Sequence, residues 1–269
     1  KNRALIDAYE LGSVLKPIVF ARAVDNETLE PDEYMEIPRR LELGNKVITD
    51  TKAYGKLTPK EIIAFSSQVG ASKIALKLGY DNLKNNYYDF GFSKPISINF
   101  PSAAFGLMNV KESVSDRELA SLGYGYGFTV SPFQITAAYS TFANSGIRKD
   151  FKLLMNDEVT SQRIISKLSA KHTLEALQKV VKIGTGKKAD ISGFTEGGKT
   201  GTVHRTVFGE GYADDLYRAS FVGIAPLKEE SLTIFVSIED PGLNAYSGGM
   251  IAAPLFAKIA ESSLNYLGY

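Results

Sequence analysis

The sequence predicts an α+β fold in which helices come first and an antiparallel sheet follows. Three observations support this prediction. Helix signals with recognisable caps dominate the chain up to about residue 183. Apolar, β-branched runs appear only after about residue 190, and they lie close enough along the chain to pair antiparallel. A helical pattern over residues 252–267 then predicts a last helix packed on the sheet.

The helices are predicted from their capping residues. An apolar helix starts near Ser13, and Pro17 is tolerable there because it falls within the first turn or so. Residues 58–61 (TPKE) form a capping box with proline at the first helical position. Ser131 is a further cap that is followed by proline. The expected helices cover residues 13–21, 58–65, 69–78, 131–144, 171–183 and 252–267.

The strands are predicted only in the last third of the chain. They cover residues 199–203, 217–225 and 232–238, where apolar or β-branched runs are bounded by glycine or proline. We therefore expect one domain over residues 1–269. Its helical part lies at approximately 13–183, and its sheet and C-terminal helix lie at approximately 190–269.

The composition excludes several classes of function. Hydrophobic residues make up 44% of the chain and charged residues 23%, with a net charge of +1, so nothing calls for nucleic acid as a partner. Cysteine is absent, which excludes a thiol nucleophile and thiolate metal sites. His172 and His204 are too far apart for metal-ligand spacing. We expect no cofactor and no metal, and no apolar run approaches the roughly 18 residues of a membrane span.

A serine and a lysine three residues apart are the first candidates for chemistry. Ser13 and Lys16 lie at a predicted helix start, so their side chains share one face. A serine becomes a strong nucleophile when a neighbouring base takes its proton. A lysine can be that base if burial or nearby positive charge lowers its pKa toward neutrality. The tetrapeptide is common by chance, so it indicates function only together with other motifs.

Two further segments supply polar side chains. Residues 66–68 (SSQ) fall at the break between two predicted helices, where they could point into a cleft or simply cap the helices. Residues 199–202 (KTGT) open a predicted strand. A lysine with flanking threonine hydroxyls suits a carboxylate, and the glycine allows close approach of the backbone.

The lysine of the last segment also fits a rival interpretation. Residues 193–200 match the Walker A phosphate loop, G-x-x-x-x-G-K-T. That loop requires a helix after its lysine, with the helix N-terminus holding the phosphates. Lys199 is instead followed by a glycine and then by β-branched, strand-like residues, which argues against a nucleotide site.

The three motifs occur together in a known order. S-x-x-K near the start, S-x-amide about fifty residues later and K-T-G well downstream form the motif set of penicillin-binding proteins and serine β-lactamases. The chain resembles class B penicillin-binding proteins over nearly its whole length, most closely the division-specific septal transpeptidases (the FtsI-like group). The other segments that carry the resemblance are residues 10–17 (ELGSVLKP), 123–134 (GYGYGFTVSPFQ), 246–249 (YSGG) and 253–256 (APLF).

The resemblance implies a fold and a reaction. The fold is that of the transpeptidase domains, an antiparallel sheet flanked by helices with an additional all-helical region. The reaction is the cross-linking of peptidoglycan stem peptides during septal cell-wall synthesis, and β-lactams would acylate the same site. Ser13 would be the acylated nucleophile and Lys16 its general base. Ser66 would relay protons toward the leaving amine, and Lys199 would steady that hydroxyl.

The remaining site residues would bind the substrate. The resemblance implies that Thr200 and Thr202 take the terminal carboxylate of a D-Ala-D-Ala stem peptide, with Gln68 and Gly201 beside them. The backbone N–H groups of Ser13 and Thr202 would form the oxyanion hole, where losing one donor typically costs about 3–4 kcal/mol. An amine of a second stem peptide would be the acceptor.

Two departures from the family pattern lead to expectations about the structure. The middle motif usually ends in Asn, whereas Gln68 here is one methylene longer. Family domains also begin with two strands well before the nucleophile, whereas only twelve residues precede Ser13. We therefore expect a sheet that lacks its N-terminal strands and has an exposed edge.

The resemblance also implies a location, and it leaves alternatives open. The domain would work at the periplasmic face of the bacterial cytoplasmic membrane, anchored by an N-terminal segment outside this chain and near divisome membrane partners. A serine β-lactamase or a D,D-carboxypeptidase would share the acylation machinery but pass the acyl group to water. A catalytically degenerate scaffold that only binds β-lactams or division partners is the third alternative.

Overall fold

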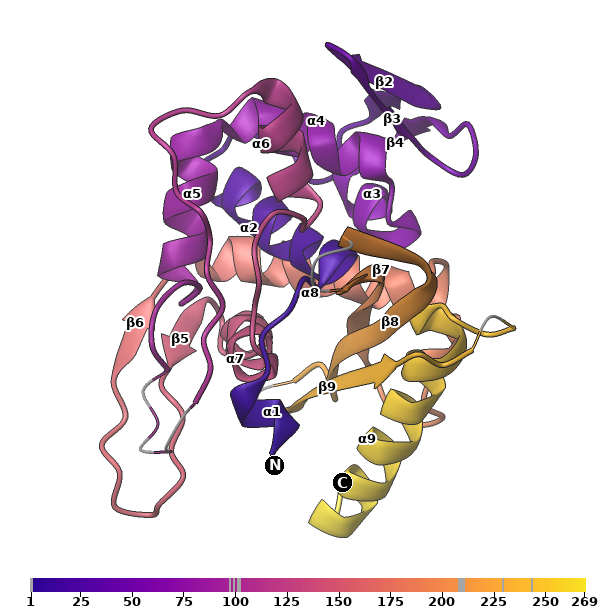
Figure 1. Ribbon diagram of the computed structural model, residues 1–269. Helices are drawn as coiled ribbons and strands as arrows, with labels where there is room; N and C mark the ends of the chain where they lie inside the picture. Colours follow the sequence, from indigo (N-terminus) through magenta and orange to yellow (C-terminus); the bar gives the residue numbers. More distant parts are fainter. Residues whose placement is uncertain are drawn as a thin grey trace.

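A computed structural model gives the architecture of the chain (Figure 1). It describes residues 2–96, 98, 100, 103–207, 211–228, 230–242 and 244–269. None of the helices in these residues is long and apolar enough to cross a membrane.

Helices form most of the first two thirds of the chain, and one long helix ends it. The helices are α1 (Arg3–Ile6), α2 (Lys16–Asp25), α3 (Pro59–Phe65), α4 (Gln68–Leu78), α5 (Tyr80–Asp89), α6 (Asp116–Gly123), α7 (Pro132–Ala143), α8 (Lys167–Lys182) and α9 (Ala253–Leu267). Short 3₁₀ turns η1 (Gly12–Leu15) and η2 (Lys187–Ala189) and a π-helical turn η3 (Gly248–Ala252) complete them.

The largest sheet lies in the last third, as predicted. It is antiparallel, with the order β7 (Gly197–Val207), β8 (Gly211–Ala225) and β9 (Leu232–Glu239). The register pairs Lys199 with Val222, and Phe221 with Val236. The expectation of an incomplete sheet is confirmed, because β9 has no strand on its outer side among the described residues. The predicted α+β fold is confirmed.

Alternate side chains of β8 join the sheet to helices on its two faces. Val222 and Ile224 belong to the large core formed with the helical part of the chain, which includes Leu177 on α8. Phe221 points the other way and contacts Phe256 on α9, with ring centroids 4.9 Å apart. The sheet therefore lies between the helical part on one face and α9 on the other, as Figure 1 shows.

The prediction that residues 13–183 are all helical is wrong in two places. Short strands β1 (Met35–Ile37), β2 (Arg40–Leu43), β3 (Lys46–Thr49) and β4 (Gly55–Leu57) follow α2, and a hairpin of β5 (Ile147–Lys149) and β6 (Ser161–Arg163) follows α7. These strands have three or four residues and are largely exposed, so they leave little apolar alternation in the sequence. The sequence signal that could have predicted the β2–β3 hairpin was its two-residue turn, Gly44-Asn45.

Three helices were missed, namely the four-residue α1 and the longer α5 and α6, and two others, α2 and α8, were predicted too short. Helix α5 is polar along most of its length, and α6 starts at a capping box that Ser115 forms with Glu118. Helix α8 starts at Lys167, four residues before the predicted start, because Ser166 accepts a hydrogen bond from Ser169 N and caps it.

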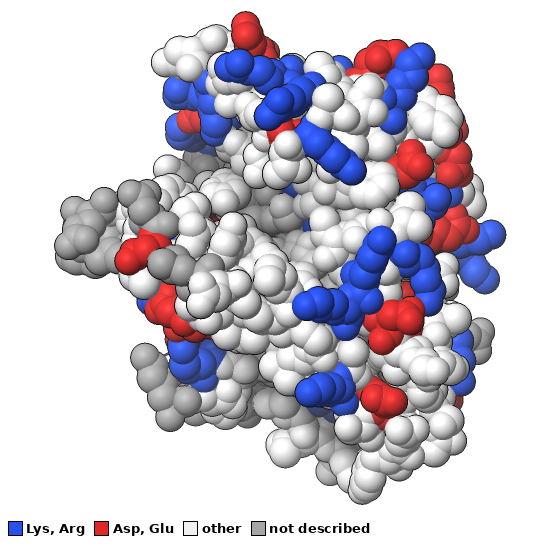
Figure 2. Space-filling model, turned by 90° about the vertical axis from the view of Figure 1, so that its right-hand side faces the viewer, with Lys and Arg blue, Asp and Glu red and all other residues white. Residues whose placement is uncertain are grey.

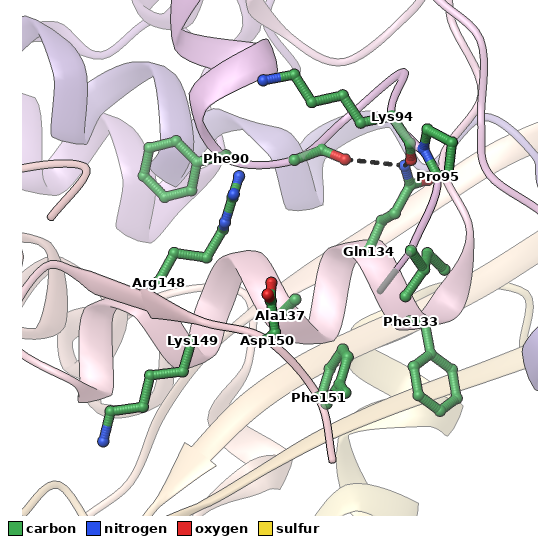
Figure 3. Close-up of a pocket in the computed structure, with 12 residues that line it drawn as sticks. Phe90, Lys94, Pro95, Phe133, Gln134, Ala137, Arg148, Lys149, Asp150 and Phe151 are labelled. Carbon is green, nitrogen blue, oxygen red and sulfur yellow. Dashed lines mark hydrogen bonds between the residues drawn. The ribbon is translucent and has the colours of Figure 1, made fainter. Parts of the chain in front are cut away.

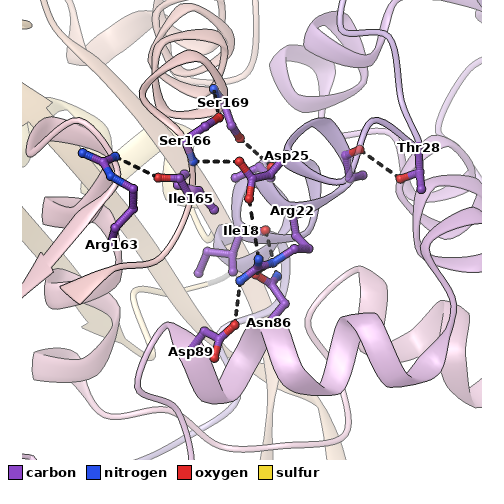
Figure 4. A network of polar contacts seen from close by, with 12 residues as sticks. Ile18, Arg22, Asp25, Thr28, Asn86, Asp89, Arg163, Ile165, Ser166 and Ser169 are labelled. Atoms are coloured by element: carbon purple, nitrogen blue, oxygen red, sulfur yellow. Dashed lines mark hydrogen bonds and ion pairs between the residues drawn. The ribbon is translucent and has the colours of Figure 1, made fainter.

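A polar network holds α2 against its neighbours (Figure 4). The guanidinium of Arg22 donates to Asn86 Oδ1 at 3.1 Å and to Asp89 Oδ2 at 2.7 Å, both on α5. On the other side of α2, Asp25 Oδ1 accepts from the N–H of Ser166, the cap of α8, at 2.7 Å. Because α2 begins at Lys16, these contacts fix the helix that carries one of the predicted catalytic residues.

Candidate active site

The predicted nucleophile lies at the start of the central helix. Ser13 is in η1, one turn before α2, and the N–H of Lys16 donates to its carbonyl oxygen. Gly12 before it has φ +59°, and a Cβ there would meet Val203 Cγ1 at 2.6 Å. Gly125 packs so closely from below that a Cβ would lie 2.0 Å from Gly12 O. Only glycine fits these two positions, so the backbone around Ser13 is held between β7 and the glycine-rich run.

Lys16 is buried and directed at the second motif. Its side chain is 1% exposed, and its Nζ donates to the carbonyl oxygen of Ser66 at 2.6 Å and lies 3.2 Å from Ser66 Oγ. Burial lowers the pKa of Lys16 to about 7, against a smaller opposing effect of the Asp50 charge. Near neutral pH, a substantial fraction of this amine is therefore uncharged and able to accept a proton.

Lys199 reaches the same serine from the sheet. It is fully buried on β7, and its Nζ lies 2.9 Å from Ser66 Oγ and donates to Thr200 O at 3.0 Å. Burial and the nearby charge of Lys16 both lower the pKa of Lys199. The two amines thus meet at one hydroxyl group, although they are 183 residues apart in the sequence.

The second motif is a sharp turn between two helices. Ser66 ends α3 in the left-handed conformation, with φ 59° and ψ 34°, which is uncommon for a residue other than glycine. Ser67 then caps α4 by accepting from Gly70 N at 2.8 Å. This turn directs Ser66 Oγ toward both amines while α4 continues away from the site.

Asp50 is a site residue that sequence reasoning missed. It lies just after β3, is 5% exposed, and accepts hydrogen bonds from Ser67 Oγ at 2.5 Å and from the N–H groups of Gln68 and Val69 at 2.6 and 3.3 Å. Its carboxylate therefore holds the first turn of α4, where a negative charge is also favoured by the helix dipole. No spacing pattern links it to the motifs, so the sequence held no signal for it.

The third motif supplies hydroxyl groups along the outer side of β7. Thr202 Oγ1 accepts from the N–H of Gly248 at 3.0 Å, which ties η3 to the strand. Thr200 Oγ1 lies 2.7 Å from Thr185 Oγ1. Thr185 is the second site residue that sequence reasoning did not identify. Gly201 leaves no room for a side chain, since a Cβ would lie 2.8 Å from Leu11 O.

The motifs open into one pocket of about 440 Å³. Ser13, Thr49, Asp50, Thr51, Tyr54, Phe65, Ser66, Gln68, Thr185, Thr200, Thr202, Ser247 and Gly249 line it. Figure 2 shows the molecule hollowed across the middle of the face that lies to the right in Figure 1, with Lys and Arg side chains above and below the hollow. The pocket is large enough for a peptide terminus or a drug-sized ligand.

The structure also shows where Gln68 lies and tests the alternative nucleotide site. The exposed side chain of Gln68 lines the pocket but makes no hydrogen bond with Lys16. Lys199 lies inside a long strand paired with β8, and no helix follows it, so the phosphate-loop interpretation is wrong. In the described part of the chain, no group of three or more His, Cys, Asp or Glu side chains could hold a metal ion.

This geometry suits nucleophilic catalysis by a serine. Two buried amines with lowered pKa converge on a hydroxyl, and a second hydroxyl at a helix start opens into the same pocket. Ser13 lines the pocket, and no hydrogen bond to its Oγ is found among the described residues. Such a site can attack a carbonyl carbon and pass a proton to the leaving group.

Comparison with known proteins is consistent with this chemistry. The sequence model of the penicillin binding protein transpeptidase domain matches residues 1–261. The chain is 31% identical over 271 residues to a probable peptidoglycan D,D-transpeptidase PenA of Neisseria flavescens, covering all of this chain and 67% of that protein. It is 31% identical over 268 residues to the peptidoglycan D,D-transpeptidase FtsI of Escherichia coli K12, covering 98% of this chain and 45% of that protein. The chain thus spans about half the length of the latter protein.

The fold comparison extends over the whole chain. The apo transpeptidase domain of penicillin-binding protein 3 from Burkholderia pseudomallei superposes with a TM-score of 0.92 at 33% sequence identity, covering 100% of this chain and 82% of that one. The family model and the structural match both extend over nearly the whole chain. The chain belongs to the penicillin-binding protein transpeptidase domain family.

Proposed function

We propose that the chain is the catalytic domain of a peptidoglycan D,D-transpeptidase that works through an acyl-enzyme at Ser13. The observation that carries this proposal is the meeting of Lys16 and Lys199 at the hydroxyl of Ser66, beside the pocket that Ser13 lines. Names of relatives such as the E. coli protein support the same reaction.

Each of the main site residues has a role in the acylation step. Lys16, as the neutral amine, takes the proton of Ser13 Oγ while the oxygen attacks the carbonyl carbon of the penultimate D-Ala. The backbone N–H groups of Ser13 and Thr202 stabilise the oxyanion. The proton then passes through Ser66 to the leaving D-Ala amine, and Lys199 orients the Ser66 hydroxyl.

The substrate carboxylate would bind along β7. The hydroxyl groups of Thr200 and Thr202 line the pocket, and Thr185 adds a third hydroxyl 2.7 Å from that of Thr200. One of the Thr185 and Thr200 hydroxyls donates to the other, and the remaining hydroxyl hydrogens suit the terminal carboxylate of a D-Ala-D-Ala stem peptide or the acidic group of a β-lactam. Gln68, on the opposite wall, would contact the peptide amides.

Deacylation separates this proposal from a β-lactamase or a carboxypeptidase. Hydrolysis needs a base that activates water near the ester. Asp50 is the one carboxylate that lines the pocket within the described residues, and its oxygens already accept three hydrogen bonds. This favours an ester that persists until an amine acceptor arrives. The complete lysine–serine cluster speaks against a degenerate scaffold.

The setting of the reaction follows from the resemblance to septal transpeptidases. We place the domain at the periplasmic face of the cytoplasmic membrane, in septal cell-wall synthesis, with an anchor and divisome partners contributed outside this domain. The amine acceptor would be a second stem peptide.

The first prediction concerns the transfer reaction. Incubation with a D-Ala-D-Ala stem peptide and an excess of a fluorescent D-amino acid should give the exchanged peptide, because the ester at Ser13 waits for an amine. Ser13→Ala should form none while keeping its thermal stability, since the Ser13 side chain caps no helix and has no hydrogen bond among the described residues to lose. Release of D-Ala without any exchanged peptide, measured by chromatography, would assign the chain to the carboxypeptidases instead.

The second prediction concerns pH. Because Lys16 must be neutral to act as base and its pKa is about 7, the rate of acylation by a fluorescent penicillin should fall about tenfold per pH unit below that value. Lys16→Ala should lose acylation across the whole range. His204→Gln is the control, because it removes the histidine nearest the motifs and should leave the acid limb in place. An acid limb that disappears in the histidine variant would reject Lys16 as the titrating group.

The third prediction concerns Asp50. Asp50→Asn removes a charge-assisted hydrogen bond that holds the 66–68 turn, so acylation should slow by about tenfold to hundredfold. The Asp50 charge also raises the pKa of Lys16, so its loss should move the acid limb to lower pH. The matched control is Asp81→Asn, which makes the same change on the surface and should alter neither quantity. A slower rate with an unmoved acid limb would show that Asp50 acts on the turn alone.

A further inference from the structure

A second pocket lies away from Ser13, between α5, α7 and the β5 strand (Figure 3). It has a volume of about 190 Å³ and shares no lining residue with the active-site pocket. Phe133, Gln134 and Ala137 of α7 form its floor, and Phe90 and the segment around Lys94 and Pro95 cover it from above. Gln134 Nε2 donates to Gly91 O and Lys94 O, at 3.0 and 3.2 Å, which fastens this segment over the floor.

The interior of the pocket is aromatic. Phe133 and Phe151 meet edge to face with ring centroids 4.9 Å apart, and both rings line the pocket. A cavity of about 150 Å³ lined by apolar side chains can hold a benzene ring, whereas ligand pockets for drug-sized molecules begin at about 300 Å³. The size of this pocket therefore matches one aromatic or large aliphatic side chain and is too small for a cofactor.

The charge around the pocket is positive. Lys94 runs along its upper edge and the guanidinium of Arg148 stands at its side, as Figure 3 shows. The one hydrogen bond of the Arg148 side chain goes to the carbonyl oxygen of Asp89, and no described carboxylate lies within salt-bridge distance of Arg148, Lys94 or Lys149. The carboxylate of Asp150 also lines the pocket, so the charged lining residues are three cations, Lys94, Arg148 and Lys149, and one anion, which leaves a net positive charge. A ligand with a negative charge next to its apolar group is thus favoured.

We propose that this pocket docks an acidic segment of a partner protein, with one aromatic or large aliphatic side chain packed in the pocket against the rings of Phe133 and Phe151. Carboxylates beside that anchor would pair with Arg148 and Lys94. Short motifs of this kind bind through one buried anchor and a charged rim. The proposal does not depend on the reaction at Ser13.

The surface beside the pocket supports a protein partner over a free small ligand. The segment that joins β5 to β6 passes through Phe151 and then carries three consecutive exposed apolar residues: Leu153 is 49% exposed, Leu154 65% and Met155 89%. Such a run is uncommon on the surface of a domain that works alone. These three residues follow Phe151 closely along the chain and do not line the pocket itself.

The test measures binding of a fluorescein-labelled peptide, Gly-Glu-Asp-Phe-Asp-Glu-Gly, to the chain by fluorescence anisotropy. Replacing the central Phe by Ala should weaken binding about tenfold to hundredfold, because burial of that ring supplies most of the affinity. A peptide with Lys and Arg in place of the acidic residues should not bind. Ala137→Leu, which fills the floor of the pocket and suits a helix, should weaken binding about tenfold.

A second part of the test reverses the charge of single lysine side chains. Lys94→Glu should weaken binding about threefold to tenfold, whereas Lys258→Glu on α9 makes the same change in net charge far from the pocket and should leave binding unchanged. A thermal unfolding midpoint close to that of the wild type, measured by circular dichroism, confirms that each variant is folded. The proposal is wrong if the peptide does not bind, if Ala137→Leu leaves binding unchanged, or if both charge variants weaken it equally. Cosedimentation with phosphatidylglycerol vesicles without peptide binding would assign the surface to a membrane and also overturn the proposal.

Discussion

Two lysine amines buried against one serine hydroxyl are the constraint on which the rest of the site depends. Lys16 and Lys199 are almost completely shielded from water, and both contact Ser66 Oγ. Burying even one ammonium group costs several kcal/mol, and two of like charge also repel one another. The protein can keep both only because their pKa values fall. The same burial that lowers the pKa of Lys16 turns it from a cation into a base.

The fold brings three segments that are distant in the sequence together at this site. The start of α2 supplies Ser13 and Lys16, the break between α3 and α4 supplies Ser66, and β7 supplies Lys199. The left-handed backbone of Ser66 is strained for a serine, and Asp50 holds the residues that follow it. On the other side of the site, Gly12 and Gly125 allow the backbones to approach closely. The polar network around Arg22 keeps α2 in place behind them.

Much of the fold and of the site could be predicted from the sequence, and the predictions that failed share a physical cause. The three motifs and the caps of Thr58 and Ser131 are local patterns, so they were recognisable without a structure. The exposed edge of the three-stranded sheet was also expected, from the family pattern of strands before the nucleophile. Asp50 acts only through contacts made after folding, and nothing in its neighbourhood marks it. The strands β1–β6 were missed because short, exposed strands have almost no apolar periodicity.

Mass spectrometry of the intact protein after mixing with benzylpenicillin, followed over hours, tests the central claim most directly. The account predicts one adduct with the mass of one benzylpenicillin molecule, located on Ser13 by peptide mapping and persisting for many minutes to hours. Persistence is expected because Asp50, the one carboxylate that lines the pocket among the described residues, already accepts three hydrogen bonds, which disfavours its action as a base on water. Rapid disappearance of the adduct with hydrolysed penicillin in solution would contradict the account and indicate a β-lactamase, and the absence of any adduct would indicate a scaffold.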